Sequence, residues 1–176
     1  MPYAIELYFD YESSKQIERI HLYLKSNGIT VDEGTKPHIS LAIFEDLPIE
    51  IFNKELENFS KNLISFELSF SSIGIFLTDS NVIYLAPKVT SKLLEIQKNF
   101  YDFFEKYIDK AWEYYLPNNW VPHCTLAMNI STDEIKETIG LLKDIEIPLK
   151  IRIAGIGILE FKPNQQISEY QLKQHD

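Results

Sequence analysis

Pro37-His38-Ile39-Ser40-Leu41-Ala42 recurs later in the chain as Pro122-His123-Cys124-Thr125-Leu126-Ala127. In both copies a proline precedes a histidine, and a hydroxyl residue follows two positions after it. Side chains at positions i and i+2 of a β-strand point to the same face of the sheet. The pattern therefore predicts two strands, in which His38 and Ser40 share one face and His123 and Thr125 share one face. The residues predicted to face the core are Ile39, Leu41, Cys124 and Leu126.

The elements that follow each histidine also repeat. In both halves of the chain, a helical pattern, an alternating strand and an Ile-Gly-Ile stretch come after the histidine, with Gly74 and Gly157 at similar distances from His38 and His123. A repeat of several elements in the same order is stronger evidence for a duplicated architecture than either histidine motif alone. It predicts one α+β domain over residues 1–176, built as two pseudo-two-fold-related lobes of antiparallel sheet with outer helices around a central cleft.

Periodicity and capping residues predict the individual elements. Strands are expected at about 4–9, 38–44, 65–77, 82–86, 123–129 and 147–161, with a short last strand after residue 162. Helices are expected at about 12–27, 48–61, 91–108 and 131–142, and residues 109–122 are irregular. A frayed end is expected at His175.

Composition limits the class of protein. The 176 residues carry 17 Lys and Arg against 26 Asp and Glu, a formal net charge of −9, which argues against extended binding of nucleic acid. Cys124 is the single cysteine, so no intramolecular disulfide can form. The amino terminus lacks the pattern of a signal peptide, and no apolar run is long enough to span a bilayer. These features predict a soluble cytoplasmic protein without a membrane partner.

The paired motifs His38-Ile39-Ser40-Leu41 and His123-Cys124-Thr125-Leu126 resemble the signature of the two-histidine (2H) phosphoesterases, the superfamily that includes bacterial 2′-5′ RNA ligase-like proteins. The resemblance covers nearly the whole chain. It implies a bilobal α+β fold, His38 and His123 as the catalytic pair, and Ser40 and Thr125 as phosphate ligands. It also implies metal-independent chemistry on 2′-phosphoesters, especially 2′,3′-cyclic phosphates. Met128 departs from the common pattern, in which a basic residue follows the second motif.

Further residues are candidates for contacts with a substrate. Lys36 and Arg152 could reach a phosphate and Tyr84 could stack on a base, although solvation of the cations and packing of the tyrosine are equally ordinary roles. His21 has no patterned partner and lies near the edge of the apolar stripe of its helix, where a surface or boundary position is expected. The spacing of the histidines predicts no metal site and no cofactor.

The resulting hypothesis is an enzyme that opens 2′,3′-cyclic phosphates of small nucleotides or RNA ends, with reversal of the reaction giving 2′-5′ ligation. Histidine can act as either base or acid near neutral pH, so both assignments of His38 and His123 are open. The alternative is a non-catalytic module that binds a nucleotide or phosphorylated metabolite in the same cleft.

Overall fold

A computed structural model describes residues 1–161 and 163–174; the expected frayed end at His175 lies outside these ranges. The chain alternates strands and helices through most of its length. In chain order the elements are β1 (Tyr3–Phe9), α1 (Tyr11–Ser26), β2 (His38–Phe44), α2 (Ile49–Ser60), β3 (Phe66–Phe76), β4 (Val82–Pro87), α3 (Ser91–Phe103), η1 (Glu105–Lys110), η2 (Glu113–Tyr115), β5 (Cys124–Met128), α4 (Thr132–Leu142), β6 (Leu149–Glu160) and β7 (Gln165–Gln171). No helix within the described ranges is both long and apolar enough to cross a membrane.

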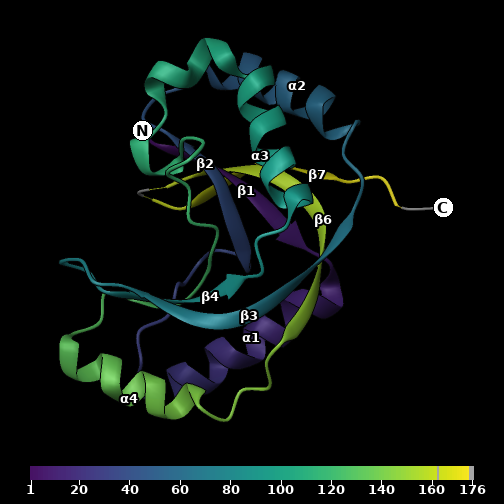
Figure 1. Cartoon of the computed structure of the whole chain (residues 1–176). Helices are drawn as coiled ribbons and strands as arrows, with labels where there is room; N and C mark the ends of the chain where they lie inside the picture. The colour runs from purple at the N-terminus through teal and green to yellow at the C-terminus, as the bar shows by residue number, and fades with distance from the viewer. Residues whose placement is uncertain (162, 175–176) are drawn as a thin grey trace.

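The strands form one antiparallel sheet in the order β2-β1-β6-β3-β4-β5, with β7 paired to β6. The long strand β6 joins the two halves of this sheet. Its first residues pair with β3, and its later residues pair with β1 and β7. The two predicted lobes are therefore two halves of one continuous sheet. Helices α2 and α3 lie over the half that contains β1 and β2, and α1 and α4 lie beneath the half that contains β3 and β4 (Figure 1).

The sequence repeat is also a repeat of topology. Elements β1-α1-β2-α2-β3 and β4-α3-β5-α4-β6 follow the same order. Strand β1 lies between β2 and β6, just as β4 lies between β5 and β3. The last strand of each repeat thus pairs with the first strand of the other repeat, which locks the two halves together.

Capping residues explain where the helices begin and end. Asp10 accepts a hydrogen bond from the backbone N–H of Ser13 at the start of α1, and Gly28, at a φ of +84°, lies just beyond its end. A capping box of Ser131 and Glu134 is present at the start of α4. At the start of α3, the side chain of Thr90 accepts a hydrogen bond from the backbone N–H of Leu93.

An aromatic cluster packs α2 and α3 against the sheet. Phe44, Phe52, Phe100 and Phe104 are fully buried, with ring centroids 4.5–6.3 Å apart in neighbouring pairs. The apolar stripe of α3 is therefore core, with two exceptions. Leu94 and Phe103 are each 48% exposed, because they lie on the flanks of the stripe, away from the sheet.

The repeated Ile-Gly-Ile stretches make room for a tyrosine in each half of the sheet. A Cβ added at Gly74 would lie 2.3 Å from the ring of Tyr84, and a Cβ added at Gly157 would lie 2.9 Å from the ring of Tyr8 and 2.2 Å from the Ser168 carbonyl oxygen. Both glycines therefore leave space that any larger residue would fill. Tyr8 and Tyr84 adjoin the two histidine motifs, so the glycine repeat supports the region around them.

Replacing Gly157 with alanine should destabilise the fold by about 1–3 kcal/mol, because the added methyl group meets the backbone of β7, which cannot move as a side chain can. Gly140→Ala in α4 is the matched control, since nothing lies within 4 Å of its added Cβ. Alanine also favours a helix over glycine by about 0.5–1 kcal/mol. Urea unfolding of both variants measures the difference, and equal stability of Gly157→Ala and wild type would contradict the prediction.

Candidate active site

The histidine motifs lie on β2 and β5, which are the first and last strands in the order of the sheet. The sheet curls, so these two strands nevertheless contact each other. The thiol sulfur of Cys124 accepts a hydrogen bond from the backbone N–H of His38. The indole N–H of Trp120, which precedes β5, donates to the carbonyl oxygen of Ser40 at 3.0 Å. The fold thus brings the two histidine motifs to one place.

Both histidine rings are held in the same way. Nδ1 of His38 lies 2.7 Å from the carbonyl oxygen of Lys36, and Nδ1 of His123 lies 2.7 Å from the carbonyl oxygen of Val121. A carbonyl oxygen only accepts, so each Nδ1 carries a proton and each Nε2 is the nitrogen that can gain or lose one. The acceptor in each motif is the residue before the proline, whose backbone the proline restricts to an extended conformation. The duplicated Pro-His pair therefore fixes the tautomer and the orientation of both rings.

Aromatic rings surround His123. Its centroid lies 5.0 Å from that of Phe76 in an edge-on arrangement and 5.3 Å from that of Tyr84. This burial lowers the pKa of His123 below its ordinary value, and the charge of nearby His38 lowers it further, against the opposing hydrogen bond to Val121. His123 is thus a neutral imidazole at neutral pH, with an unprotonated Nε2 that can accept a proton.

His38 has a different neighbour. Its Nε2 lies 3.3 Å from Oε1 of Glu6, a carboxyl group on β1 that is 2% exposed. Burial raises the pKa of Glu6, whereas His38 and the hydroxyl of Tyr8 act in the opposite direction. Oε2 of Glu6 lies 2.7 Å from the hydroxyl of Tyr8. The two histidines therefore share a backbone geometry but differ in electrostatic surroundings.

The hydroxyl residues and the cysteine lie where strand alternation predicts. Ser40 is cross-strand from Glu6 and buried, and its hydroxyl faces Tyr115, whose pKa is raised to about 12 by burial and by Glu6. Thr125 is half-buried, and its backbone pairs with that of Tyr84. Cys124 faces the core, and burial raises the pKa of its thiol to about 12, so it is a neutral thiol.

The other predicted substrate contacts have partners within the protein. Lys36 forms an ion pair with Glu169 on β7 and lies over the ring of Tyr8. Arg152 pairs with Glu67 at 2.9 Å, and its backbone contacts the start of α1. Tyr84 is buried, stacked on Phe76 and in contact with His123. The structure thus brings Tyr84 to His123 and places each of the two cations against a carboxylate.

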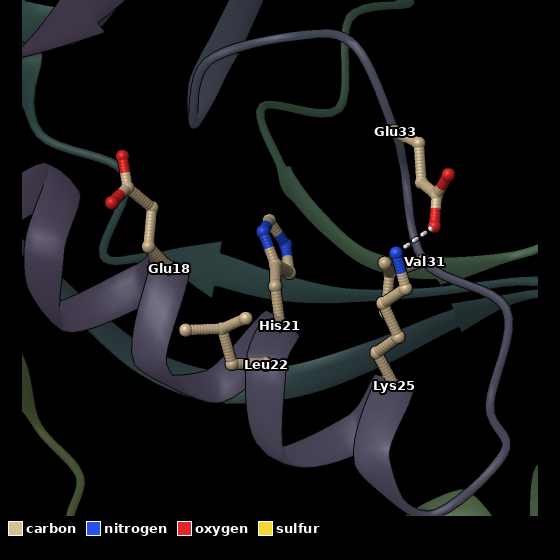
Figure 2. A pocket seen from close by; sticks show the side chains of 6 residues that line it. All are labelled: Glu18, His21, Leu22, Lys25, Val31 and Glu33. Carbon is tan, nitrogen blue, oxygen red and sulfur yellow. Dashed lines mark ion pairs between the residues drawn. The ribbon is translucent and has the colours of Figure 1, made fainter.

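Two surface pockets lie outside the histidine pair. A pocket of about 490 Å³ is lined in part by Tyr8, Lys36 and Glu169, next to the His38 motif. A smaller pocket of about 220 Å³ lies over α1 and is lined by Glu18, His21, Leu22, Lys25, Val31 and Glu33, with Lys25 and Glu33 ion-paired at its rim (Figure 2). Among residues 1–161 and 163–174, no group of three or more His, Cys, Asp and Glu side chains is arranged to hold a metal ion.

His21 lines the smaller pocket and has a structural contact, in keeping with its position at the edge of the apolar stripe of α1. Its Nε2 lies 2.9 Å from the carbonyl oxygen of Thr125, so it donates a hydrogen bond to the second histidine motif. Helix α1 is thereby attached to β5.

Sequence reasoning missed Glu6 as a member of the site and considered Tyr8, on the same strand face, only as a ring that could stack on a base. Alternation in the first strand places both side chains on one face, which was expected to be the exposed face of a half-buried strand. They are 2% exposed, because Gln166 of β7 and the segment around Tyr115 cover them. An acidic residue and a tyrosine two positions apart were the available signal, but only the pairing of β1 with β2 connects them to His38.

Comparison with known proteins identifies the family and the fold. Residues 9–165 match the family model described as the 2′-5′ RNA ligase superfamily. A "putative phosphoesterase" of Bacillus licheniformis is 30% identical over 110 residues, which span 61% of each chain. The structure is similar to that of TT0787 of Thermus thermophilus, with a TM-score of 0.67 at 13% identity over the whole of both chains. It is also similar to Escherichia coli LigT in its apo form, with a TM-score of 0.66 at 15% identity over 98% of each chain.

The family match covers most of the chain, and the fold is the one that LigT and TT0787 adopt. The predicted α+β fold and the predicted family are thereby confirmed. The chain belongs to the 2′-5′ RNA ligase superfamily of two-histidine phosphoesterases.

Proposed function

We propose that this protein is a metal-independent phosphoesterase that opens 2′,3′-cyclic phosphates on small nucleotides or RNA ends. His38 and His123 form its acid–base pair, and Ser40 and Thr125 bind the phosphate. The observation that carries the proposal is the matched geometry of the two rings, each with Nδ1 bound to a carbonyl oxygen at 2.7 Å and Nε2 left as the site of proton exchange.

The reaction needs a base and an acid on opposite sides of phosphorus. One Nε2 takes a proton from water as the water oxygen bonds to phosphorus, and the other Nε2 gives a proton to the ribose oxygen as its bond to phosphorus breaks. The hydroxyl groups of Ser40 and Thr125 donate to the non-bridging oxygens, where negative charge increases. The reverse reaction joins a hydroxyl group to a cyclic phosphate, so 2′-5′ ligation needs no nucleotide cofactor.

A small substrate or an RNA end fits the charge of the protein better than a long nucleic acid. The net charge of −9 disfavours broad contacts with a polyanion, and Lys36 and Arg152 are each paired with a carboxylate. The comparison structures of Escherichia coli LigT include complexes with 3′-AMP, ATP and NADP+. A single nucleotide or the end of an RNA chain is therefore the substrate class that we propose.

The test is to incubate the protein with 2′,3′-cyclic AMP and with RNA ending in a 2′,3′-cyclic phosphate, in the presence of a chelator. The expected result is release of a phosphomonoester, with a variant that lacks both imidazoles as the blank. Calorimetry with the same compounds distinguishes an enzyme from a module that binds the nucleotide without converting it. Binding without product would support a nucleotide-binding module and overturn the enzymatic proposal.

The pH dependence of this activity follows from the surroundings of His123. A general base must be unprotonated, and burial lowers the pKa of His123 below the ordinary value of 6.5. Activity is lost as pH falls through that lowered pKa, so the acid limb of the kcat/KM profile should lie below pH 6.5. A kcat/KM profile that extends about two pH units to either side of the ordinary histidine pKa of about 6.5 measures the limb. An acid limb above the ordinary value would contradict the role of a buried His123 as base.

A further inference from the structure

Glu6 is a buried carboxyl group at the His38 end of the candidate site. It is 2% exposed, cross-strand from Ser40 and 3.3 Å from Nε2 of His38 through Oε1. A buried ionised carboxyl group is costly unless it is paired and hydrogen-bonded. The protein nevertheless places Glu6 where a strand residue facing the interior is ordinarily apolar, which points to a role at His38.

A chain of hydrogen bonds holds the other oxygen of Glu6. Oε2 lies 2.7 Å from the hydroxyl of Tyr8, and that hydroxyl lies 3.0 Å from Oε1 of Gln166. The amide nitrogen of Gln166 donates to the carbonyl oxygens of Ile158 and Ser168, so its Oε1 can only accept. Gly157 leaves the space in which the ring of Tyr8 lies. Residues of β6 and β7 therefore fix the position of Glu6 on the side opposite His38.

These hydrogen bonds are compatible with both protonation states of Glu6. When Glu6 is a carboxylate, the hydroxyl group of Tyr8 donates its hydrogen bond to Oε2 of Glu6. When Glu6 is a carboxylic acid with its proton on Oε1, it donates to Nε2 of His38, and Oε2 still accepts from Tyr8. On the other side, Nδ1 of His38 is bound to the Lys36 carbonyl oxygen, so Nε2 is the only nitrogen of that ring that exchanges a proton. One proton can thus move between Glu6 and His38 while Glu6, Tyr8 and Gln166 all keep hydrogen-bond partners.

We propose that Glu6 is the proton partner of His38: the Glu6–His38 pair holds one proton, which His38 gives to the leaving oxygen of the substrate. This inference rests on the proposed function and assigns the acid role to His38 and the base role to His123. Glu6 is a positioning residue, because it acts through His38. The 3.3 Å separation is longer than a charge-assisted hydrogen bond of about 2.8 Å, which leaves the Nε2 proton available to a third group.

Two protons move as the bonds to phosphorus change. Water bonds to phosphorus through its oxygen, and its proton passes to Nε2 of His123. The bond between phosphorus and the ribose oxygen breaks, its electron pair stays on that oxygen, and the oxygen takes the proton from Nε2 of His38. The pair then consists of a neutral imidazole and the Glu6 carboxylate, and it takes a proton from solvent while His123 releases one.

Other charged groups also face the pair. Asp32 raises the pKa of Glu6, as burial does, and Tyr115 and His123 lie within electrostatic reach of Glu6 and His38 respectively. Lys36 and Glu169 form an ion pair beside the ring of Tyr8. Of the acidic groups in this set, Glu6 is the one within 4 Å of a nitrogen of His38. Removing its charge should therefore affect His38 more than removing any of the others.

The experiment compares pH profiles of wild type and Glu6→Gln on 2′,3′-cyclic AMP. An opposite charge within about 4–6 Å stabilises the charged form of a group by one pH unit or more. We expect the alkaline limb of kcat/KM to move down by about one unit in Glu6→Gln, which is a loss of about tenfold above that limb. The acid limb, assigned to His123, should stay in place. Glu45→Gln is the matched control, because Glu45 bonds to the indole of Trp112 and the amide can keep that bond.

A second measurement keeps this inference separate from the proposed function. In ¹⁵N NMR spectra recorded at one pH, the Nε2 signal of His38 should change in Glu6→Gln relative to wild type, because Nε2 loses the carboxylate that lies 3.3 Å away, whether or not the protein turns over the substrate. Glu6→Asp, which keeps the charge at a greater distance, should give a smaller change and serves if Glu6→Gln does not fold. Turnover by wild type with an unmoved alkaline limb and an unchanged Nε2 signal would overturn the role of Glu6 alone. No turnover by wild type would overturn the proposed function, and the Nε2 signal would then decide whether Glu6 acts on His38.

Discussion

Replacing His123 with asparagine is expected to lower kcat/KM for 2′,3′-cyclic AMP by about 10²–10⁴-fold, the range typical of a lost general base. The asparagine amide can take the place of Nδ1 and donate to the carbonyl oxygen of Val121, which the histidine does at 2.7 Å. It has no atom in the place of Nε2. The substitution therefore removes the group that exchanges protons and keeps the hydrogen bond that positions the side chain.

The matched control for this prediction is His21→Gln. His21 also bonds to a backbone carbonyl oxygen of the second histidine motif, but through Nε2, which the glutamine amide can replace. Steady-state kinetics and thermal unfolding of both variants separate a chemical loss from a structural one. The prediction fails if His123→Asn keeps its activity, or if His21→Gln loses as much activity as His123→Asn.

The duplicated motif made the centre of the site predictable from the sequence. A single Pro-His-x-Ser stretch is consistent with an ordinary strand at the edge of a core. Two copies, each followed by the same elements, predicted a symmetric pair of strands and placed Cys124 and Leu126 in the core, where both are buried. The function of the prolines could not be predicted, because the bond from each Nδ1 to the residue before the proline depends on side-chain geometry.

The surroundings of the two histidines could not be predicted, because they depend on contacts between distant segments. Glu6 reaches His38 through the pairing of β1 with β2, and Tyr8 reaches Gln166 across 158 positions of the chain. Strand alternation alone gives two faces and does not say which one a later strand will cover. The covering by β7 turns a face that looked solvent-exposed into an interior one, and this is why Glu6 was missed.

The cations illustrate the same limit. The guanidinium group of Arg152 leaves the core face of its strand and pairs with Glu67 on the neighbouring strand. Lys36 precedes the first histidine in the sequence, yet its side chain turns to Glu169 on β7. A positive charge close in sequence to a candidate catalytic residue can thus be held by a carboxylate of the protein itself. The contacts of Lys36 and Arg152 with substrate stay predictions. Each contact requires the cation to leave its carboxylate partner and bind a phosphate instead.

Replacing Thr125 with valine should lower kcat by about 10²–10³-fold, as expected for the loss of one hydroxyl donor to an oxygen that gains charge in the transition state. Valine has the shape of threonine and a strong preference for strands, so β5 and its pairing with β4 should persist. The loss should fall on kcat more than on KM, because the hydrogen bond strengthens as the charge on the phosphate oxygens increases.

Thr125→Ser distinguishes the hydroxyl group from the rest of the side chain. Serine keeps the donor and loses only the methyl group, so Thr125→Ser should stay close to wild type while Thr125→Val is impaired. Equal losses in the two variants would mean that Thr125 contributes by packing. Because Thr125 is half-buried whereas Ser40 is buried beside Tyr115 and Trp120, we expect Ser40→Ala to affect stability as well as kcat. The two hydroxyl groups are therefore equivalent in the sequence repeat but not in their surroundings, and Thr125 gives the cleaner measure of phosphate binding.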